Sequence, residues 1–82
     1  MYKAILTMNN EDYSGKGDTA IEAMDNIPMT WDKVKAKGII TLKNGKLSAE
    51  KLFYLPRLKR IFTSPVTRKF WARNLEYLLG KQ

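Results

Sequence analysis

The chain has 82 residues, no histidine, no cysteine and a net charge of +7. This composition excludes a disulfide-built scaffold, a zinc site of the His–Cys type and the usual catalytic bases and nucleophiles, so we expect neither an enzyme nor a cofactor. With 44% hydrophobic residues, the sequence predicts one globular domain over residues 1–82.

Charge is unevenly distributed along the chain. Residues 1–32 contain two basic and six acidic residues, a net charge of −4, whereas residues 33–82 contain thirteen basic and two acidic residues, a net charge of +11. Such a division predicts a surface that faces a polyanion, or two complementary faces that meet in an assembly. A basic surface that only keeps the protein in solution is the third interpretation.

The chain begins with the pattern of a β-hairpin. Residues 2–8 alternate as a strand does, residues 9–12 have turn chemistry, and a short return strand is expected around residues 13–14. Gly15 and Gly17 follow, and we interpret them as a flexible turn into a helix. Their spacing is too short for a phosphate-binding loop, and an aspartate follows them.

A helix is expected next. Thr19 and Glu22 form a capping box at its start, and Pro28 ends its helical spacing of apolar residues. Residues 29–34 form a connector, in which Trp31 is interpreted as an anchor to the core.

The clearest hairpin signal lies between residues 35 and 55. Asn44-Gly45 is the preferred pair for a type I′ turn, in which both positions need positive φ. With these two residues as the loop, Lys43 pairs with Lys46, and like charges opposed in this way suggest a functional role. The pairing places four side chains on one face: Ile40, Leu42, Leu47 and Ala49. The alternation breaks at residues 51–55, which predicts a bulge or a fully buried strand end.

Two helical segments follow, a short one from Pro56 and a long one from Pro65 to Leu79. Ser64 is the expected N-cap of the long helix, and Gly80 is its expected end. At 100° per residue, its broad apolar face contains Trp71, Ala72, Leu75, Leu78 and Leu79. A second apolar stripe contains Val66, Phe70 and Tyr77, so this helix lies between layers or has one face free for a partner.

The fold class that these elements predict is α+β. Their order is ββαββα, and the economical arrangement is a small antiparallel sheet with the helices packed on one face. The long C-terminal helix is the largest single element.

We expect the basic second half to bind nucleic acid through backbone contacts. The candidate residues are Lys43, Lys46, Arg57, Lys59, Arg60, Arg68, Lys69 and Arg73. If this hypothesis holds, the helical cations share one solvated side with the hairpin lysines. The long helix is too apolar to read a DNA groove, and its aromatic residues suit a core better than base stacking.

The alternative is a structural or protein-interaction module that oligomerises through the apolar C-terminal helix or joins another assembly protein. No stretch has the length of a membrane span or the pattern of a signal peptide, so we expect no membrane partner and a cytoplasmic location.

Several segments together resemble small, Lys-rich proteins encoded in bacteriophage and prophage gene clusters. They are Tyr2-Lys3-Ala4-Ile5-Leu6, the helix start from Gly17 to Ala23, Lys37-Gly38-Ile39-Ile40 and the Arg-rich helical end. The resemblance extends over most of the chain and implies a setting, the host cytoplasm or a virion, without implying an activity.

Overall fold

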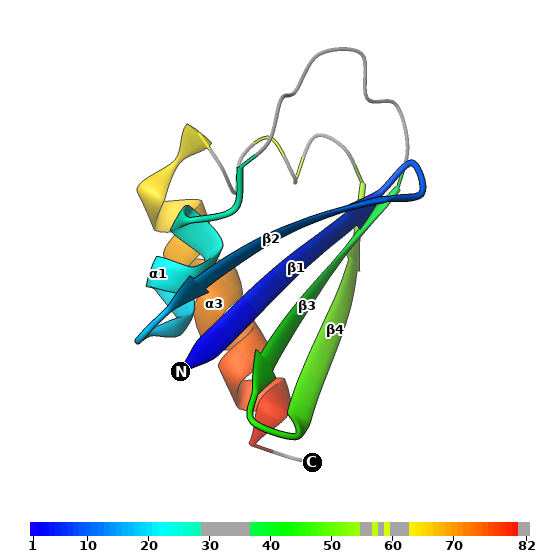
Figure 1. Cartoon of the computed structure of the whole chain (residues 1–82). Helices are drawn as coiled ribbons and strands as arrows, with labels where there is room; N and C mark the ends of the chain where they lie inside the picture. The colour runs from blue at the N-terminus through cyan, green and yellow to red at the C-terminus, as the bar shows by residue number, and fades with distance from the viewer. Residues whose placement is uncertain (29–36, 55–56, 58, 60–62, 81–82) are drawn as a thin grey trace.

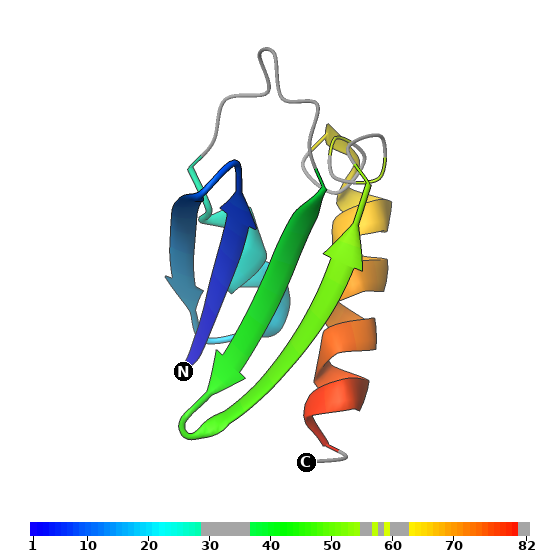
Figure 2. The ribbon, with the colours of Figure 1, turned by 90° about the vertical axis from the view of Figure 1, so that its right-hand side faces the viewer.

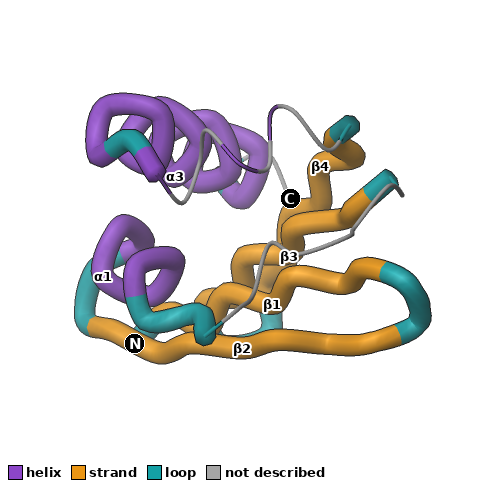
Figure 3. The backbone as a smooth tube through the Cα atoms, turned by 90° about the horizontal axis from the view of Figure 1, so that it is seen from above, coloured by secondary structure: helices purple, strands orange, loops and turns teal. Residues whose placement is uncertain are grey.

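The protein, as described by a computed structural model, is an antiparallel sheet covered by helices on one face (Figures 1 and 3). The structure describes residues 1–28, 37–54, 57, 59 and 63–80. The strands and helices are β1 (Tyr2–Met8), β2 (Glu11–Gly17), α1 (Ala20–Asp25), β3 (Gly38–Asn44), β4 (Leu47–Phe53) and α3 (Pro65–Leu79). The strand order is β2-β1-β3-β4, with all neighbours antiparallel. The predicted α+β class and ββαββα order are confirmed.

The core lies between the sheet and the two helices. Along β1 and β3, alternate residues are buried under the helices, as a strand with one covered face requires. The largest fully buried side chains are Phe53, Leu6, Met24, Ile40, Leu42 and Leu75. In Figure 2, α3 runs behind the β3–β4 hairpin, and its C-terminal end lies near the hairpin turn.

The glycines of β2 let α1 lie directly on this strand. A Cβ at Gly15 would overlap the carbonyl oxygen of Ala23 and lie 2.6 Å from the backbone nitrogen of Ile27, and a Cβ at Gly17 would lie 2.7 Å from the nitrogen of Ala23. The side chain of Asn26 also donates a hydrogen bond of 2.7 Å to the Lys16 carbonyl. The prediction of a flexible turn at these glycines was wrong, because both belong to β2 and provide room for a helix backbone.

The predicted capping box of α1 is confirmed. The Glu22 backbone N–H donates to the Thr19 hydroxyl at 3.2 Å, and the Glu22 carboxylate accepts from the Asp18 backbone N–H at 3.1 Å. The return bond reaches one residue before the cap, a small variation on the usual motif. The connector at residues 29–34 and its expected anchor Trp31 lie outside the described residues.

The two hairpins use different turns. Asn9 and Asn10 have φ values of +54° and +63°, the pattern of a type I′ turn. The turn predicted over residues 9–12 is therefore confirmed at its first two positions, whereas Glu11 and Asp12 already belong to β2. In the second hairpin, Asn44 pairs with Leu47, and Gly45 has a φ of +62° as the first loop residue. This is the pattern of a type II′ turn, in which only the first loop position has positive φ.

The pairing predicted for the second hairpin was therefore wrong by two residues. Lys43 lies opposite Ser48 and Leu42 lies opposite Ala49, whereas Lys46 belongs to the turn. Gly45 and Lys46 form the loop, because glycine takes the one position that needs positive φ. The pairing of β4 with β3 then continues without a bulge to Phe53. Leu52 and Tyr54 on either side of the buried Phe53 are exposed, so neither the expected bulge nor the expected fully buried strand end is found in the described part of residues 51–55.

α3 has the expected ends and the expected buried face. The Ser64 hydroxyl accepts from the Thr67 backbone N–H at 3.5 Å, and Pro65 is the first helical residue. Gly80 ends the helix with a φ of −67°, so this position does not need the left-handed conformation of glycine. The predicted broad face has four buried residues, Trp71, Ala72, Leu75 and Leu79, with Leu78 packed beside them.

Candidate nucleic-acid interface

A row of three lysines crosses the sheet face opposite the one that the described helices cover (Figure 3). Lys3 of β1 lies directly opposite Lys16 of β2 and directly opposite Lys43 of β3. Directly opposite residues of antiparallel strands share a face, and these three alternate with buried neighbours such as Ala4 and Leu42, so they point away from the core. All three are exposed. Since neighbouring strands lie about 4.8 Å apart, the row is about 10 Å long.

The lysine row (Lys3, Lys16 and Lys43) is unfavourable for the sheet itself. Like charges directly opposite each other destabilise a strand pair. Within the described part of the chain, none of the three forms an ion pair. The nearest acidic residue on the same face, Glu50, lies in the next row, opposite Thr41. The fold therefore gains nothing from this concentration of positive charge.

The sheet face that carries the lysine row (the open face) changes in composition along the strands. The row after the lysines contains Ser14, Ile5, Thr41 and Glu50, and the third row contains Asp12, Thr7, Ile39 and Leu52. In the third row the Thr7 hydroxyl donates to the Asp12 carboxylate at 2.7 Å. The basic end of this face thus lies beside the β3–β4 turn, and an acidic residue marks the other end.

A second acidic side chain, Glu11, lies beside this end of the sheet on the β1–β2 hairpin. The Tyr13 hydroxyl donates to the Glu11 carboxylate at 2.6 Å. This hydrogen bond, together with the negative charge of Glu11, raises the pKa of Tyr13.

Both predicted hairpin lysines lie at the basic end of the sheet. Lys43 belongs to the lysine row, and Lys46 is exposed in the adjacent turn. They do not form the cross-strand pair that the sequence predicted. Lys46 instead extends the positive surface beyond the strand ends, which adds a fourth cation to the same region.

The cations predicted after β4 lie far from this region. Arg57 and Lys59 are exposed and follow the opposite end of β4. A strand of seven residues separates them from the β3–β4 turn, a distance of about 20 Å at the usual rise. Arg60 lies outside the described residues.

Arg68 already has a structural partner. Its Nε forms an ion pair with the Asp25 carboxylate, and 21% of the Arg68 side chain is exposed. Asp25 ends α1 and Arg68 lies in the first part of α3, so the pair connects the two helices. Of the predicted residues that the structure describes, this one is the least available for a ligand.

Lys69 and Arg73 lie on the solvent side of α3 and are exposed. Because α3 buries Trp71 and Leu75 against the sheet, a 100° helical wheel turns Arg73 away from the strands. The helical cations and the lysine row therefore occupy different faces of the molecule. The predicted single basic side is divided.

Sequence reasoning missed Lys3 and Lys16, because both belong to the half with net negative charge. The signal was present in the Asn9-Asn10 turn, which fixes the pairing of β1 with β2 and places these lysines opposite each other. The addition of Lys43 to the row required the pairing of β1 with β3, which no local turn specifies.

Comparisons with protein-family models, with curated proteins and with solved structures find no match for this chain. Among the described residues, no group of acidic side chains could hold a metal ion. No helix in the same part of the chain is long and apolar enough to cross a membrane.

Proposed function

We propose that this protein is a small, non-enzymatic module that binds nucleic acid by contacts with phosphates. The observation that supports this most strongly is the lysine row on the open sheet face, extended by Lys46 at the turn. Four exposed cations at one end of the sheet concentrate positive charge where no acidic residue lies directly opposite. The setting implied by the resemblance, a phage or prophage protein in the host cytoplasm or a virion, belongs to this proposal.

The mode of binding follows from the kinds of side chain on this face. Lysine is a flexible point charge, which suits contact with phosphate rather than recognition of a base edge. The three rows across the open face contain no aromatic residue that could stack on an unpaired base. The proposal is therefore binding without sequence preference, driven by the release of counterions from the nucleic acid.

The test is a salt titration of binding to short duplex DNA, single-stranded DNA and RNA. The test variant is Lys3→Gln/Lys16→Gln/Lys43→Gln. The control variant, Lys59→Gln/Lys69→Gln/Arg73→Gln, loses the same amount of charge from other parts of the surface. For duplex DNA, the test variant should reduce the slope of log affinity against log salt by about 2.7, since each phosphate contact contributes about 0.9.

The control variant should keep most of the slope, because its residues lie away from the lysine row. Equal losses in the two variants would show that only net charge matters, which contradicts a defined interface. Absence of wild-type binding to all three probes at about 50 mM salt would rule out the proposal.

A second candidate function is self-association through α3. Val66, Phe70 and Tyr77 are 78%, 60% and 62% exposed, and a 100° helical wheel places Val66 and Tyr77 opposite the buried face of α3. Large apolar side chains gathered on one exposed helix face are typical of an interaction surface. Sedimentation velocity over a concentration series tests this: a dimer that Val66→Ser/Tyr77→Ser converts to a monomer would support it, and a monomeric wild type would exclude it.

A further inference from the structure

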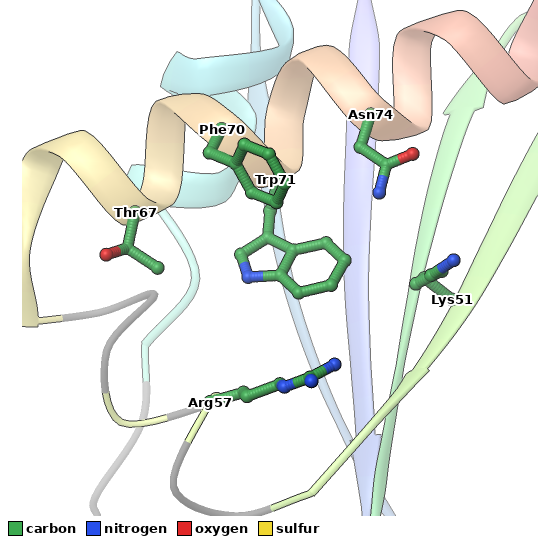
Figure 4. A pocket seen from close by; sticks show the side chains of 6 residues that line it. All are labelled: Lys51, Arg57, Thr67, Phe70, Trp71 and Asn74. Carbon is green, nitrogen blue, oxygen red and sulfur yellow. The ribbon is translucent and has the colours of Figure 1, made fainter.

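A pocket of about 380 Å³ lies between β4 and α3, on the helix-covered side of the sheet. Its volume is within the usual range for small-molecule sites. Figure 4 shows that Trp71 and Asn74 extend from α3 into the space, and that the Arg57 side chain runs below the Trp71 ring toward Lys51. The lining residues are Lys51, Arg57, Thr67, Phe70, Trp71 and Asn74.

The pocket is positively charged. Lys51 and Arg57 both line it, and no acidic side chain is among the described residues that line it. Within the described residues, neither cation forms an ion pair. Two like charges that approach the same space repel each other, and an anion placed between them would relieve that repulsion. The guanidinium of Arg57 also offers the planar, forked donors that suit a phosphate group.

The aromatic side of the pocket combines a fixed ring with an accessible one. Trp71 is 6% exposed, and its ring packs edge-to-face on Phe53 with centroids 4.1 Å apart. Phe70 is 60% exposed and meets Trp71 at 5.4 Å with an interplanar angle of 76°. The buried tryptophan holds the wall in place, while Phe70 presents a ring to which a planar group can bind.

Polar groups for recognition come from the same helix. Asn74 and Thr67 both line the pocket from α3. An amide can donate and accept hydrogen bonds at once, as the edge of a nucleobase requires, and a hydroxyl can do the same. The pocket therefore contains the three chemistries of a nucleotide site: cations, an aromatic surface and an amide.

We propose that this pocket binds a nucleotide, with its phosphate between Lys51 and Arg57 and its base against Phe70. This site is separate from the lysine row, which lies on the other face of the sheet. The ligand is either a free mononucleotide or an unpaired nucleotide within a strand. Both sources have the same chemistry, so the experiment must distinguish them.

The test is isothermal titration calorimetry of the full chain at low salt with four probes: AMP, adenosine, inorganic phosphate and a short single-stranded oligoadenylate. AMP should bind at least tenfold more tightly than adenosine or phosphate, because only AMP engages both halves of the pocket. Tighter binding of the oligoadenylate than of AMP, lost in the same variants, would identify a nucleotide within a strand as the ligand. Equal or weaker binding of the oligoadenylate would identify a free mononucleotide.

Variants locate the site. Lys51→Ala/Arg57→Ala should weaken AMP binding at least tenfold while adenosine binding stays unchanged, and Phe70→Leu should weaken AMP and adenosine binding in parallel. The matched control is Lys69→Ala/Arg73→Ala, which removes two cations from the solvent side of α3 and should leave AMP binding unchanged. The melting temperature of each variant is also measured. A value equal to that of the wild type shows that a loss of affinity does not result from a loss of folding.

Three results would overturn the nucleotide site. They are no heat with AMP at millimolar concentration, equal AMP binding by the wild type and Lys51→Ala/Arg57→Ala, and phosphate binding as tight as that of AMP. The last would indicate an anion site without base recognition. Because duplex binding is assigned to the lysine row, failure here leaves the proposed function standing, and failure of the Lys3/Lys16/Lys43 variant leaves this pocket standing.

Discussion

The two ββα halves of this protein attach their helices to the sheet in opposite ways. In the first half, a helix of six residues lies directly on a glycine-containing strand, and backbone meets backbone. In the second half, a helix of fifteen residues packs on the sheet through large buried side chains such as Trp71, whose ring meets that of Phe53. The two halves thus share the same order of elements, but the first leaves no room for a Cβ at Gly15 or Gly17, whereas the second depends on large buried side chains.

This difference explains why the two halves present different surfaces. The close contact of α1 leaves little room beside β2 for a ligand, whereas the side chains between α3 and β4 leave the pocket lined by Lys51 and Arg57. A helix that packs through large residues leaves space wherever those residues do not fill it. The candidate small-molecule site is therefore a product of how the second half packs.

The largest expected effect comes from removal of the Trp71 side chain, which packs between α3 and the sheet in the second half. Trp71→Ala should lower the free energy of unfolding by about 3–5 kcal/mol, because a buried tryptophan leaves a cavity beside Phe53. Urea denaturation measures this change. The control is Phe70→Ala at the exposed neighbouring ring, and a loss as large as that of Trp71→Ala would show that α3 does not pack as described.

A methyl group added to a glycine of β2 should destabilise the packing of the first half. Gly15→Ala should destabilise by about 3 kcal/mol, the upper part of the usual range for overpacking, because the new methyl group meets helix backbone that cannot rotate away. The neighbouring Ser14→Ala is the matched control, since Ser14 is exposed on the open face. If Gly15→Ala melts at the wild-type temperature, α1 does not lie directly on β2.

The smallest expected effect lies where the two halves meet. Lys43→Gln should stabilise the protein by a few tenths of a kcal/mol at low salt, since it removes repulsion from Lys3 across the β1–β3 pair. The gain should fade as salt is added. A double-mutant cycle with Lys3→Gln measures the coupling, and a cycle without coupling energy would mean that the two ammonium groups do not repel each other.

The sequence predicted the types and order of the elements well, because each has a strong local signal. Thr19 and Ser64 act as the caps that their positions predict, and the helical spacing of Trp71 and Leu75 identifies the buried face of α3. These signals depend on residues a few positions apart. Local patterns therefore fixed what the elements are.

Pairing between strands was harder to predict, for a reason visible in the second hairpin. The predicted partner of Leu42 was Leu47, and the observed partner is Ala49. A displacement of two residues keeps every side chain on its original face, so the hydrophobic pattern fits both pairings. The two pairings differ at Asn44, which needs positive φ in the predicted turn and does not have it, whereas Gly45 has positive φ in either turn.

The candidate sites were the least predictable part, because each joins residues that lie far apart in the chain. The lysine row brings Lys3, Lys16 and Lys43 together through two strand pairings. The pocket joins Lys51 of β4 with Phe70 and Asn74 of α3. Charge counting pointed to the second half alone, whereas the sheet draws its lysine row from both halves.

The position of β1 in the middle of the sheet has a consequence for the order of folding. Each hairpin pairs residues close in sequence, so β1–β2 and β3–β4 can each form on a timescale of about 1–10 μs. The β1–β3 pairing instead joins residues such as Ala4 and Leu42, far apart along the chain. Closure of that long loop opposes this step entropically, so we expect docking of two preformed hairpins along β1 and β3 to set the folding rate. Substitutions at Leu6 or Ile40, which face each other across this seam, should slow refolding more than substitutions within either hairpin turn.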